Sequence, residues 1–241
     1  MKKILSLFLF VALSASATAP ATVTVPDASL GAVDYDVCYR LAGITTKVAT
    51  ATVTFVESEW DGKPAYHSLA KIVTQPFFRL FLKPEYKAEA WYAREDLSPL
   101  YFTNPFTDGK KEGNYVVYYN YTSRTIRSAW TVEGEEPLEM TYDMGDQPMM
   151  ELLSTLMFVR YHDFGEGTPV KIAVIFPSKA RDAEISRVGD NLVLQIVGKG
   201  IMENGSGNRL LFRRSTAPDR RILRLEADLG SGTLICTARE Q

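Results

Sequence analysis

The sequence has few of the side chains that usually bind metals or act as nucleophiles. Its 241 residues include two histidines and two cysteines. His67 and His162 are far apart along the chain, so neither has a histidine partner at the spacing of a metal site. No serine lies in a G-x-S-x-G motif, and the stretch at 198–200 (GKG) lacks the third glycine of a nucleotide-binding loop. We therefore expect no metal, no cofactor and no catalytic residue, and we favour a protein that is not an enzyme.

An excess of positive charge is also absent. Lysine and arginine number 27 against 29 aspartate and glutamate residues, which gives a net charge of −2. Proteins that bind nucleic acid need clustered basic residues, so we expect no nucleic-acid partner. The one compact basic group is interpreted as a solvated hairpin end rather than an anion site. It consists of Arg213, Arg214, Arg220 and Arg221.

Only one long hydrophobic run is present, from Ile4 to Leu13. Two lysines precede it, and an A-x-A pattern that ends at Ala17 follows it. This arrangement is typical of a secretory signal peptide, so we expect residues 1–17 to be removed after Ala17 and the mature protein to be periplasmic or secreted. No second run approaches the roughly 20 apolar residues of a transmembrane helix, so we do not expect an integral membrane protein.

The rest of the chain has the pattern of a β-rich domain. Residues 18–32 are small and contain proline, and we expect them to form a flexible arm. From Val33 to Leu41, apolar and polar residues alternate, which is typical of a strand with one buried face. We therefore expect a single β-rich domain over residues 33–241. Further strands are expected at 47–57, 65–74, 85–94, 101–106, 114–121, 124–132, 170–176, 183–188, 192–198, 209–214, 221–227 and 232–238, with a short helical turn at 77–82.

One segment has helical spacing instead. Residues 147–161 read QPMMELLSTLMFVRY, with Asp146 as the expected N-cap and Pro148 in the first turn. Its apolar residues cover more than one face, which indicates a buried helix. The sequence thus predicts a mainly β fold: a curved antiparallel sheet, or a partly open β-barrel or sandwich, of about ten or more strands with one buried central helix.

The helix should lie against the concave face of the sheet. We expect Leu153, Leu156 and Met157 to contact the first strand, and Arg160 to pair with a carboxylate or with carbonyl groups, because an unpaired buried charge is costly. The expected partners on the first strand are Tyr35, Val37 and Tyr39.

The order of several segments is similar to that of domain-of-unknown-function family 3108, a group of exported bacterial proteins. The segments are YDVCYRLAGI, YKAEAWYAREDLSPLYF, DMGDQPMMELLSTLMFVRY and GEGTPVKIAVIF. The residues that match the family pattern are Tyr35, Val37, Tyr39, Gly43, Asp146, Ser154 and Arg160, whereas Phe158-Val159 replaces the usual tyrosine pair. The resemblance covers most of residues 33–240. It implies a β-rich fold like that of periplasmic carriers of lipids and lipoproteins, and no established activity.

Aromatic and methionine residues are the remaining candidates for a binding site. Nine aromatic residues lie between Trp91 and Tyr121, and four methionines lie between Met144 and Met157. They predict either the wall of an apolar site or ordinary core packing, and we favour core packing. If the helix leaves space inside the sheet, the residues expected to line it are Tyr39, Trp91, Tyr101, Leu153, Met157 and Arg160.

The two cysteines lie in the first and last expected strands. A disulfide between Cys38 and Cys236 is possible if those strands are neighbours in an oxidising compartment. The alternation of the two strands opposes it, because Cys38 falls in the polar phase of its strand and Cys236 in the apolar phase.

The sequence predicts an exported, β-rich domain and does not identify a specific activity. The interpretation that we favour is a protein that binds or carries a lipid-like hydrophobic ligand. One alternative is an envelope interaction or assembly protein without a small ligand. The other is a hydrolase on a β-sandwich, which would need two facing carboxylates in a cleft.

Overall fold

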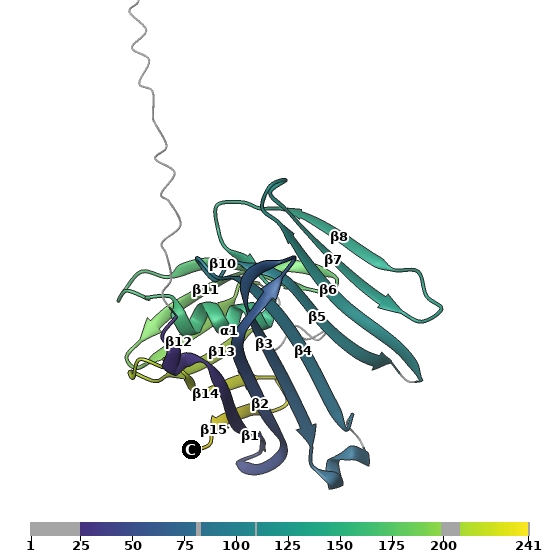
Figure 1. The fold of residues 1–241 in the computed structure, drawn as a ribbon. Coiled ribbons are helices and arrows are strands. Elements are labelled where there is room, and N and C mark those ends of the chain that lie inside the picture. The colour runs from purple at the N-terminus through teal and green to yellow at the C-terminus, as the bar shows by residue number, and fades with distance from the viewer. Residues whose placement is uncertain (1–24, 81–82, 109, 199–207, 241) are drawn as a thin grey trace, which may run out of the picture.

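A computed structural model describes residues 25–80, 83–108, 110–198 and 208–240 (Figure 1). The expected signal peptide, and the arm up to residue 24, lie outside the described residues. The elements are η1 (Asp27–Ser29), β1 (Gly31–Leu41), β2 (Ile44–Trp60), β3 (Lys63–Thr74), η2 (Pro76–Leu80), β4 (Glu85–Ala93), β5 (Pro99–Asp108), β6 (Lys111–Asn120), β7 (Thr125–Val132), β8 (Leu138–Asp143), β9 (Met149–Met150), α1 (Leu152–Tyr161), β10 (Val170–Phe176), β11 (Lys179–Val188), β12 (Asn191–Ile196), β13 (Arg209–Arg214), β14 (Ile222–Asp228) and β15 (Thr233–Ala238).

The strands form one continuous sheet. Within the described residues it has 15 strands in the order β8-β7-β6-β5-β4-β3-β2-β1-β15-β14-β13-β12-β11-β10-β9. Neighbouring strands are antiparallel, except that β9 pairs in parallel with β10. The sheet curls into a β-barrel-like shape that stays open, with β8 at one end and β9 at the other (Figure 1). A mainly β fold with a curved sheet and one helix is therefore confirmed.

Tight turns with left-handed backbone conformation join the long strands at the N-terminal side. Ala42 and Gly43 between β1 and β2 have φ values of 48° and 84°, and Asp61 and Gly62 between β2 and β3 have 51° and 71°. Two successive residues with positive φ match the twist of an antiparallel hairpin, and glycine adopts this conformation without strain. These turns let β1, β2 and β3 pair along most of their length.

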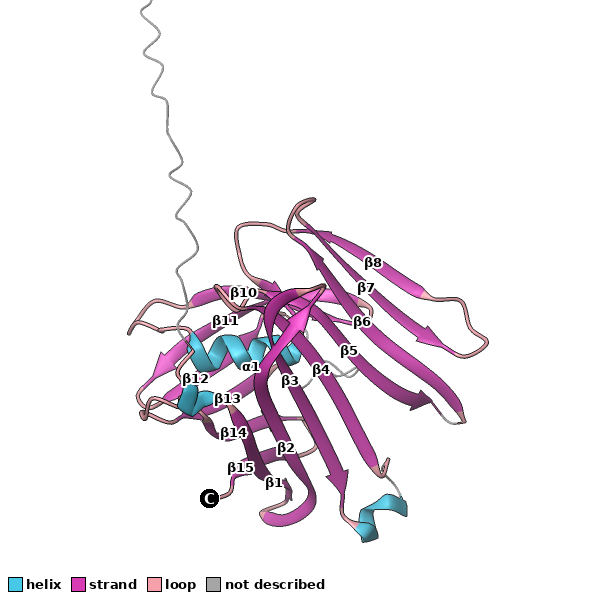
Figure 2. Ribbon diagram, in the orientation of Figure 1, coloured by secondary structure: helices cyan, strands magenta, loops and turns pink. Residues whose placement is uncertain are grey.

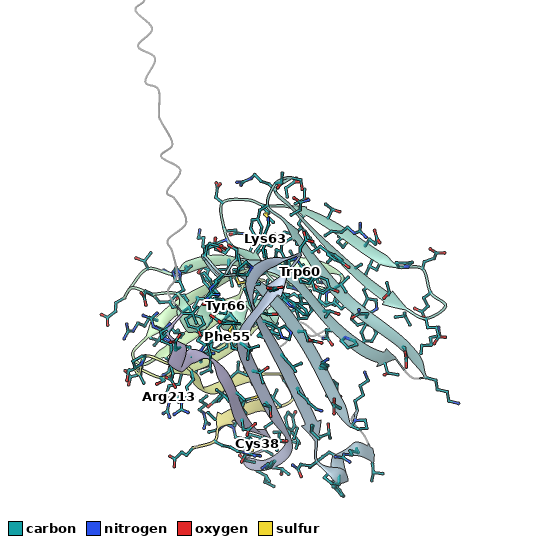
Figure 3. The ribbon with its side chains drawn as sticks, viewed as in Figure 1. Cys38, Phe55, Trp60, Lys63, Tyr66 and Arg213 are labelled. Carbon is teal, nitrogen blue, oxygen red and sulfur yellow. The ribbon has the colours of Figure 1, made fainter. Side chains whose placement is uncertain are left out.

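Helix α1 lies inside the curve of the sheet, with strands on both sides (Figure 2). Leu153, Met157 and Tyr161 pack into a core that includes Phe55 on β2 and Tyr92 on β4. Phe55 lies 5.8 Å from Tyr161 between ring centroids, at the place where the sheet bends around the helix (Figure 3). The opposite side of the helix contributes Val159 to a second core, which the inward residues of β10 to β14 complete. The buried central helix is confirmed.

The contact expected between the helix and the first strand is wrong. Tyr35 and Val37 of β1 are buried in a separate cluster with Ala49 and Ala51 of β2. The helix packs instead against strands farther along the sheet, among them β4 and β10. Leu156 joins the two helix-bearing cores and not the cluster on β1.

The helix begins later than the sequence indicates. Residues Met149 and Met150 form β9 and pair with Ala173 and Val174 of β10, so the α-helix starts only at Leu152. The N-cap is Glu151, not Asp146, because the chain before residue 151 is extended. The methionines were assigned to the helix because a two-residue strand has no periodicity of its own.

Two further expectations need correction at the edges of the domain. Strand β8 was not expected, although Met140 and Tyr142 alternate with more exposed neighbours, because an edge strand buries little of either face. The described part of the expected arm is packed, not loose. Val25 and Leu30 contact the core, Ser29 is buried, and β1 begins at Gly31.

The possible disulfide between Cys38 and Cys236 is not formed, and both cysteines are free. Strands β1 and β15 are indeed neighbours, but Cys236 pairs with Val37 while Cys38 pairs with Ile235. Successive residues of a strand point to opposite faces, so the two thiols lie on opposite sides of the sheet.

The position of α1 predicts different effects for two adjacent leucines. Leu153 is 4% exposed in the core, whereas Leu152 is 45% exposed. Leu153→Asp should prevent folding, because it places a charge among apolar side chains, while Leu152→Asp should stay folded with a small change in stability. Circular dichroism and the yield of soluble, monodisperse protein measure both. A soluble, natively folded Leu153→Asp protein would contradict a helix buried in this orientation.

Candidate functional site

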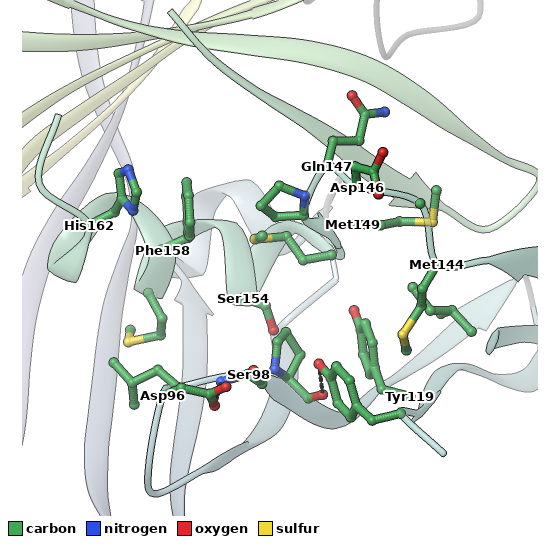
Figure 4. Close-up of a pocket in the computed structure, with 18 of the residues that line it drawn as sticks. Asp96, Ser98, Tyr119, Met144, Asp146, Gln147, Met149, Ser154, Phe158 and His162 are labelled. Carbon is green, nitrogen blue, oxygen red and sulfur yellow. Dashed lines mark hydrogen bonds between the residues drawn. The ribbon is translucent and has the colours of Figure 1, made fainter. Parts of the chain in front are cut away.

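A cavity of about 530 Å³ lies beside the helix α1 (Figure 4). Its walls are one face of α1, the turn between β4 and β5, the ends of β6 and β7, and the segment that leads from β8 to α1. The lining residues are Asp96, Leu97, Ser98, Pro99, Tyr119, Tyr121, Arg124, Ile126, Met144, Gly145, Asp146, Gln147, Pro148, Met149, Met150, Ser154, Met157, Phe158, Tyr161 and His162.

The segment from residue 144 to residue 150 forms one wall because several hydrogen bonds fix it. The backbone N–H of Met144 donates to the carbonyl of Arg124 at 2.8 Å, and the Arg124 guanidinium returns a bond to the carbonyl of Met144 at 2.9 Å. Farther along, the Gln147 amide donates to Asp182 at 3.0 Å. The segment thus spans the opening between the two ends of the sheet, and the cavity lies beneath it.

The wall facing the interior is mostly apolar. Four methionines line it, from β9, from α1 and from the connecting segment: Met144, Met149, Met150 and Met157. They are the four methionines that the sequence left open between an apolar site and core packing. Methionine is unbranched and flexible, and it adapts to ligands of varied shape. The opposite wall carries Tyr119 and Tyr121, whose hydroxyls are already engaged, one by the backbone N–H of Glu151 and the other by the carbonyl of Pro99.

A buried carboxyl group lies directly behind the cavity wall. Glu151 is 1% exposed, and its side chain accepts hydrogen bonds from the backbone N–H of Ser154 at 2.7 Å and from the Ser154 hydroxyl. It therefore caps the N-terminus of α1, where orphan N–H groups favour a negative group. Burial opposes ionisation more strongly than these bonds favour it, and raises the pKa of Glu151 to about 7.

The other end of α1 is held by arginines. Arg214 donates from one nitrogen to the carbonyls of Val159, Arg160 and His162 at 2.9–3.0 Å, and Arg220 donates to the carbonyl of Tyr161 at 2.9 Å. Cations are favoured at this end of a helix because its carbonyls carry partial negative charge. Two of the four arginines interpreted as a solvated hairpin end therefore cap the helix.

Arg160 is paired as expected, and its partners are carbonyl groups. The side chain is 6% exposed and donates to the carbonyls of Ser29 and Asp219, each at 2.9 Å from one of its terminal nitrogens. It joins the helix to the N-terminal segment and to the loop after β13. It does not line the cavity.

A family model described as "Protein of unknown function (DUF3108)" matches residues 34–201. The chain belongs to this family. No curated protein matches the sequence. Among solved structures, the chain resembles the crystal structure of a β-barrel-like protein of the DUF1849 domain from Brucella abortus. The two share 10% identity and a TM-score of 0.51 over 91% of this chain and 98% of the other. This likeness supports the β-barrel-like fold alone.

In this member of the DUF3108 family, the residues that carry the sequence resemblance have structural roles. Gly43 provides the left-handed turn between β1 and β2, Ser154 bonds the N-cap Glu151, and Arg160 anchors the end of the helix. Two of these residues, Ser154 and Arg160, therefore hold α1 in the sheet. The cavity is bounded mainly by other residues.

Only one of the six residues expected to line a ligand site does so, namely Met157. Leu153 points into the packed core, and Tyr39 lies at the far end of β1, where its hydroxyl is 3.0 Å from that of Ser231. Trp91 and Tyr101 lie on the outer face of the sheet, because their neighbours Tyr92 and Phe102 fill the inner face.

On that outer face, the aromatic rings stack against one another. Trp91 lies 4.3 Å from His67 and 5.6 Å from Tyr101, and Trp60 lies 4.9 Å from Tyr101, between ring centroids. These are cross-strand pairs that stabilise the sheet. The aromatic residues from Trp91 to Tyr121 thus lie on both faces of the sheet. Of these, only the inward residues Tyr119 and Tyr121 line the cavity.

The residues missed at the site come mainly from turns. Ser98, Arg124, Asp146 and Gln147 lie outside strands and helices and have no periodicity to mark them. The density of methionine between 144 and 157 was the one usable signal, since it points to an adaptable apolar surface.

Glu151 makes stability depend on pH. Its folded-state pKa of about 7 lies above the ordinary glutamate value of 4.5, so the folded protein binds the proton more tightly than the unfolded chain. The stabilisation that comes from this tighter proton binding is fully present below about pH 4.5. It is lost as pH rises through about 7, which lowers the free energy of unfolding by about 3 kcal/mol. Glu151→Gln should remove this decline, as measured by urea unfolding between pH 4.5 and 8.

The exposed Glu139 on β8 provides the matched control for that measurement. Glu139→Gln should keep the pH profile of the unmodified protein. If Glu151→Gln and the unmodified protein lost stability in parallel over this range, the buried carboxyl would not be the group that titrates.

Proposed function

We propose that this protein binds or carries a lipid-like hydrophobic ligand in the cavity beside α1. The observation that carries the proposal is the cavity itself: about 530 Å³, walled by four methionines and by aromatic side chains. Sites for small ligands commonly measure about 300–1,000 Å³ and are mostly apolar with a few polar groups. The polar groups here gather in the turns at the rim.

The architecture supports reversible entry of a ligand. The wall at residues 144–150 is a connection between two sheet ends that do not pair with each other. Its displacement would break the two-residue pairing of β9 with β10 and the hydrogen bonds of Met144 and Gln147, but it would leave the strand ladders of β1 to β7 in place. Eight of the 20 lining residues are methionine, tyrosine or phenylalanine, and this apolar share favours binding over hydrolysis.

The cavity predicts how affinity depends on chain length. Straight-chain alkanols should displace the neutral fluorescent probe N-phenyl-1-naphthylamine, because each added methylene leaves water. Affinity should rise up to about fourfold per carbon, from about 0.8 kcal/mol per buried methylene, until the cavity is full. Competition titrations with alkanols of increasing length measure this.

A matched pair of variants locates the binding. Met144→Trp should fill part of the cavity and weaken probe binding at least tenfold, whereas Met140→Trp, on β8 and outside the lining, should bind normally. Failure of the unmodified protein to bind the probe or any alkanol, or equal binding by both variants, would refute an apolar binding site here.

Export is the second part of the proposal. It is supported by the two lysines, the apolar run from Ile4 and the A-x-A pattern at the start of the chain. N-terminal sequencing of secreted or periplasmic protein should begin within residues 18–22. Cytoplasmic protein that retains Met1 would oppose export.

An envelope interaction protein is the second candidate, and one observation favours it. Strand β8 is the last strand at one end of the sheet, so its outer backbone groups have no strand partner within the described residues. A partner protein could add a strand at this edge. Native mass spectrometry separates the two candidates, because a carrier retains lipid after purification whereas a protein that binds through its edge does not.

A further inference from the structure

We propose that the ligand of this cavity is an amphiphile with a positively charged head group. This inference rests on the proposed function, and it adds the chemistry of the head. The charged groups that line the cavity include two carboxylates, Asp96 and Asp146, and one guanidinium, that of Arg124. The balance of charge at the rim therefore favours a cation.

The two carboxylates are available to a ligand. Asp146 has no hydrogen bond or ion pair with any residue in the described part of the chain, and Asp96 uses one oxygen to accept the backbone N–H of Ser98 at 2.9 Å. They lie on different walls, with Asp96 on the turn after β4 and Asp146 on the segment before β9 (Figure 4). A head group in the cavity thus has a carboxylate on either wall.

The cationic side chains at the cavity offer less to an anionic head. Arg124 is hydrogen-bonded to the wall, since one terminal nitrogen of its guanidinium donates to the carbonyls of Met144 and Gly145 at 2.9 and 3.5 Å. His162 is stacked on Phe158, with 4.6 Å between ring centroids, and partial burial lowers its pKa, so it is uncharged at neutral pH.

An aromatic ring adds a second attraction for a cation. Tyr121 lines the cavity. Burial raises the pKa of its hydroxyl, and the negative charge of Asp96 raises that pKa further, so the two groups lie within electrostatic reach of each other. The face of an aromatic ring attracts an ammonium group, and a neighbouring carboxylate strengthens this attraction. The chain of the amphiphile would then extend along Met149, Met157 and Phe158.

The test compares three ligands of equal chain length: dodecylammonium, dodecanol and laurate. Each is titrated against bound N-phenyl-1-naphthylamine at pH 7 and low salt, below its micelle concentration. We expect dodecylammonium to bind at least tenfold more tightly than laurate, with dodecanol between them, and the difference to shrink at high salt because exposed charges are screened.

Variants show whether the rim carboxylates cause the preference. Asp96→Asn and Asp146→Asn should each reduce the advantage of dodecylammonium severalfold and leave dodecanol unchanged. Asp190→Asn, an exposed change in the turn between β11 and β12, should keep the advantage.

The outcomes separate this inference from the proposed function. If dodecanol binds but laurate equals or exceeds dodecylammonium, or if the double Asp96→Asn/Asp146→Asn variant keeps the full preference, the cationic head is refuted and the apolar site stands. If none of the three ligands displaces the probe, or the probe itself does not bind, both are refuted.

Discussion

The whole fold depends on holding both ends of one buried helix. The first N–H groups and the last C=O groups of any helix lack partners within it, and inside a protein each unpaired group costs free energy. In α1, Glu151 accepts a hydrogen bond from the N-terminal N–H of Ser154, and Arg214 and Arg220 donate hydrogen bonds to the C-terminal carbonyls. These partners come from the sequence before the helix and from the hairpin of β13 and β14, so they fix the helix against widely separated parts of the sheet.

This arrangement also explains why the sheet stays open. The chain enters α1 from β8 through residues 144–150 and leaves it toward β10, so the helix connection passes between the two edges of the sheet. Direct pairing of β8 with β9 would close the barrel over this connection. Instead, β9 pairs for only two residues with β10, and the cavity occupies the space under the connecting segment. An apolar site beside the helix is a consequence of how the helix is threaded.

The sequence predicted well the strands and the helix, which have a repeating pattern of apolar residues. It predicted poorly the helix start, the helix caps and the contacts between distant segments. Alternation located most strands to within a few residues, because every second side chain enters a continuous core. The helix was found from its apolar residues, yet its start was misplaced, since Met149 and Met150 suit a strand and a helix equally. The cap at Glu151 and the roles of Arg214 and Arg220 depend on contacts between distant segments, which no local pattern records.

The candidate site was only partly predictable for a related reason. Trp91 and Tyr101 were expected inside because aromatic residues are large and apolar, but strand phase decides the face, and their neighbours Tyr92 and Phe102 take the inner positions. The residues that bound the cavity lie largely in turns, where side-chain identity is not constrained by the core. Of the residues shared with the DUF3108 pattern, Ser154 and Arg160 hold the helix, whereas Asp146 lines the cavity together with the methionines. Most residues that line the cavity are thus not the residues that cap the helix, so the lining can change while the helix and its capping groups Glu151, Arg214 and Arg220 remain in place.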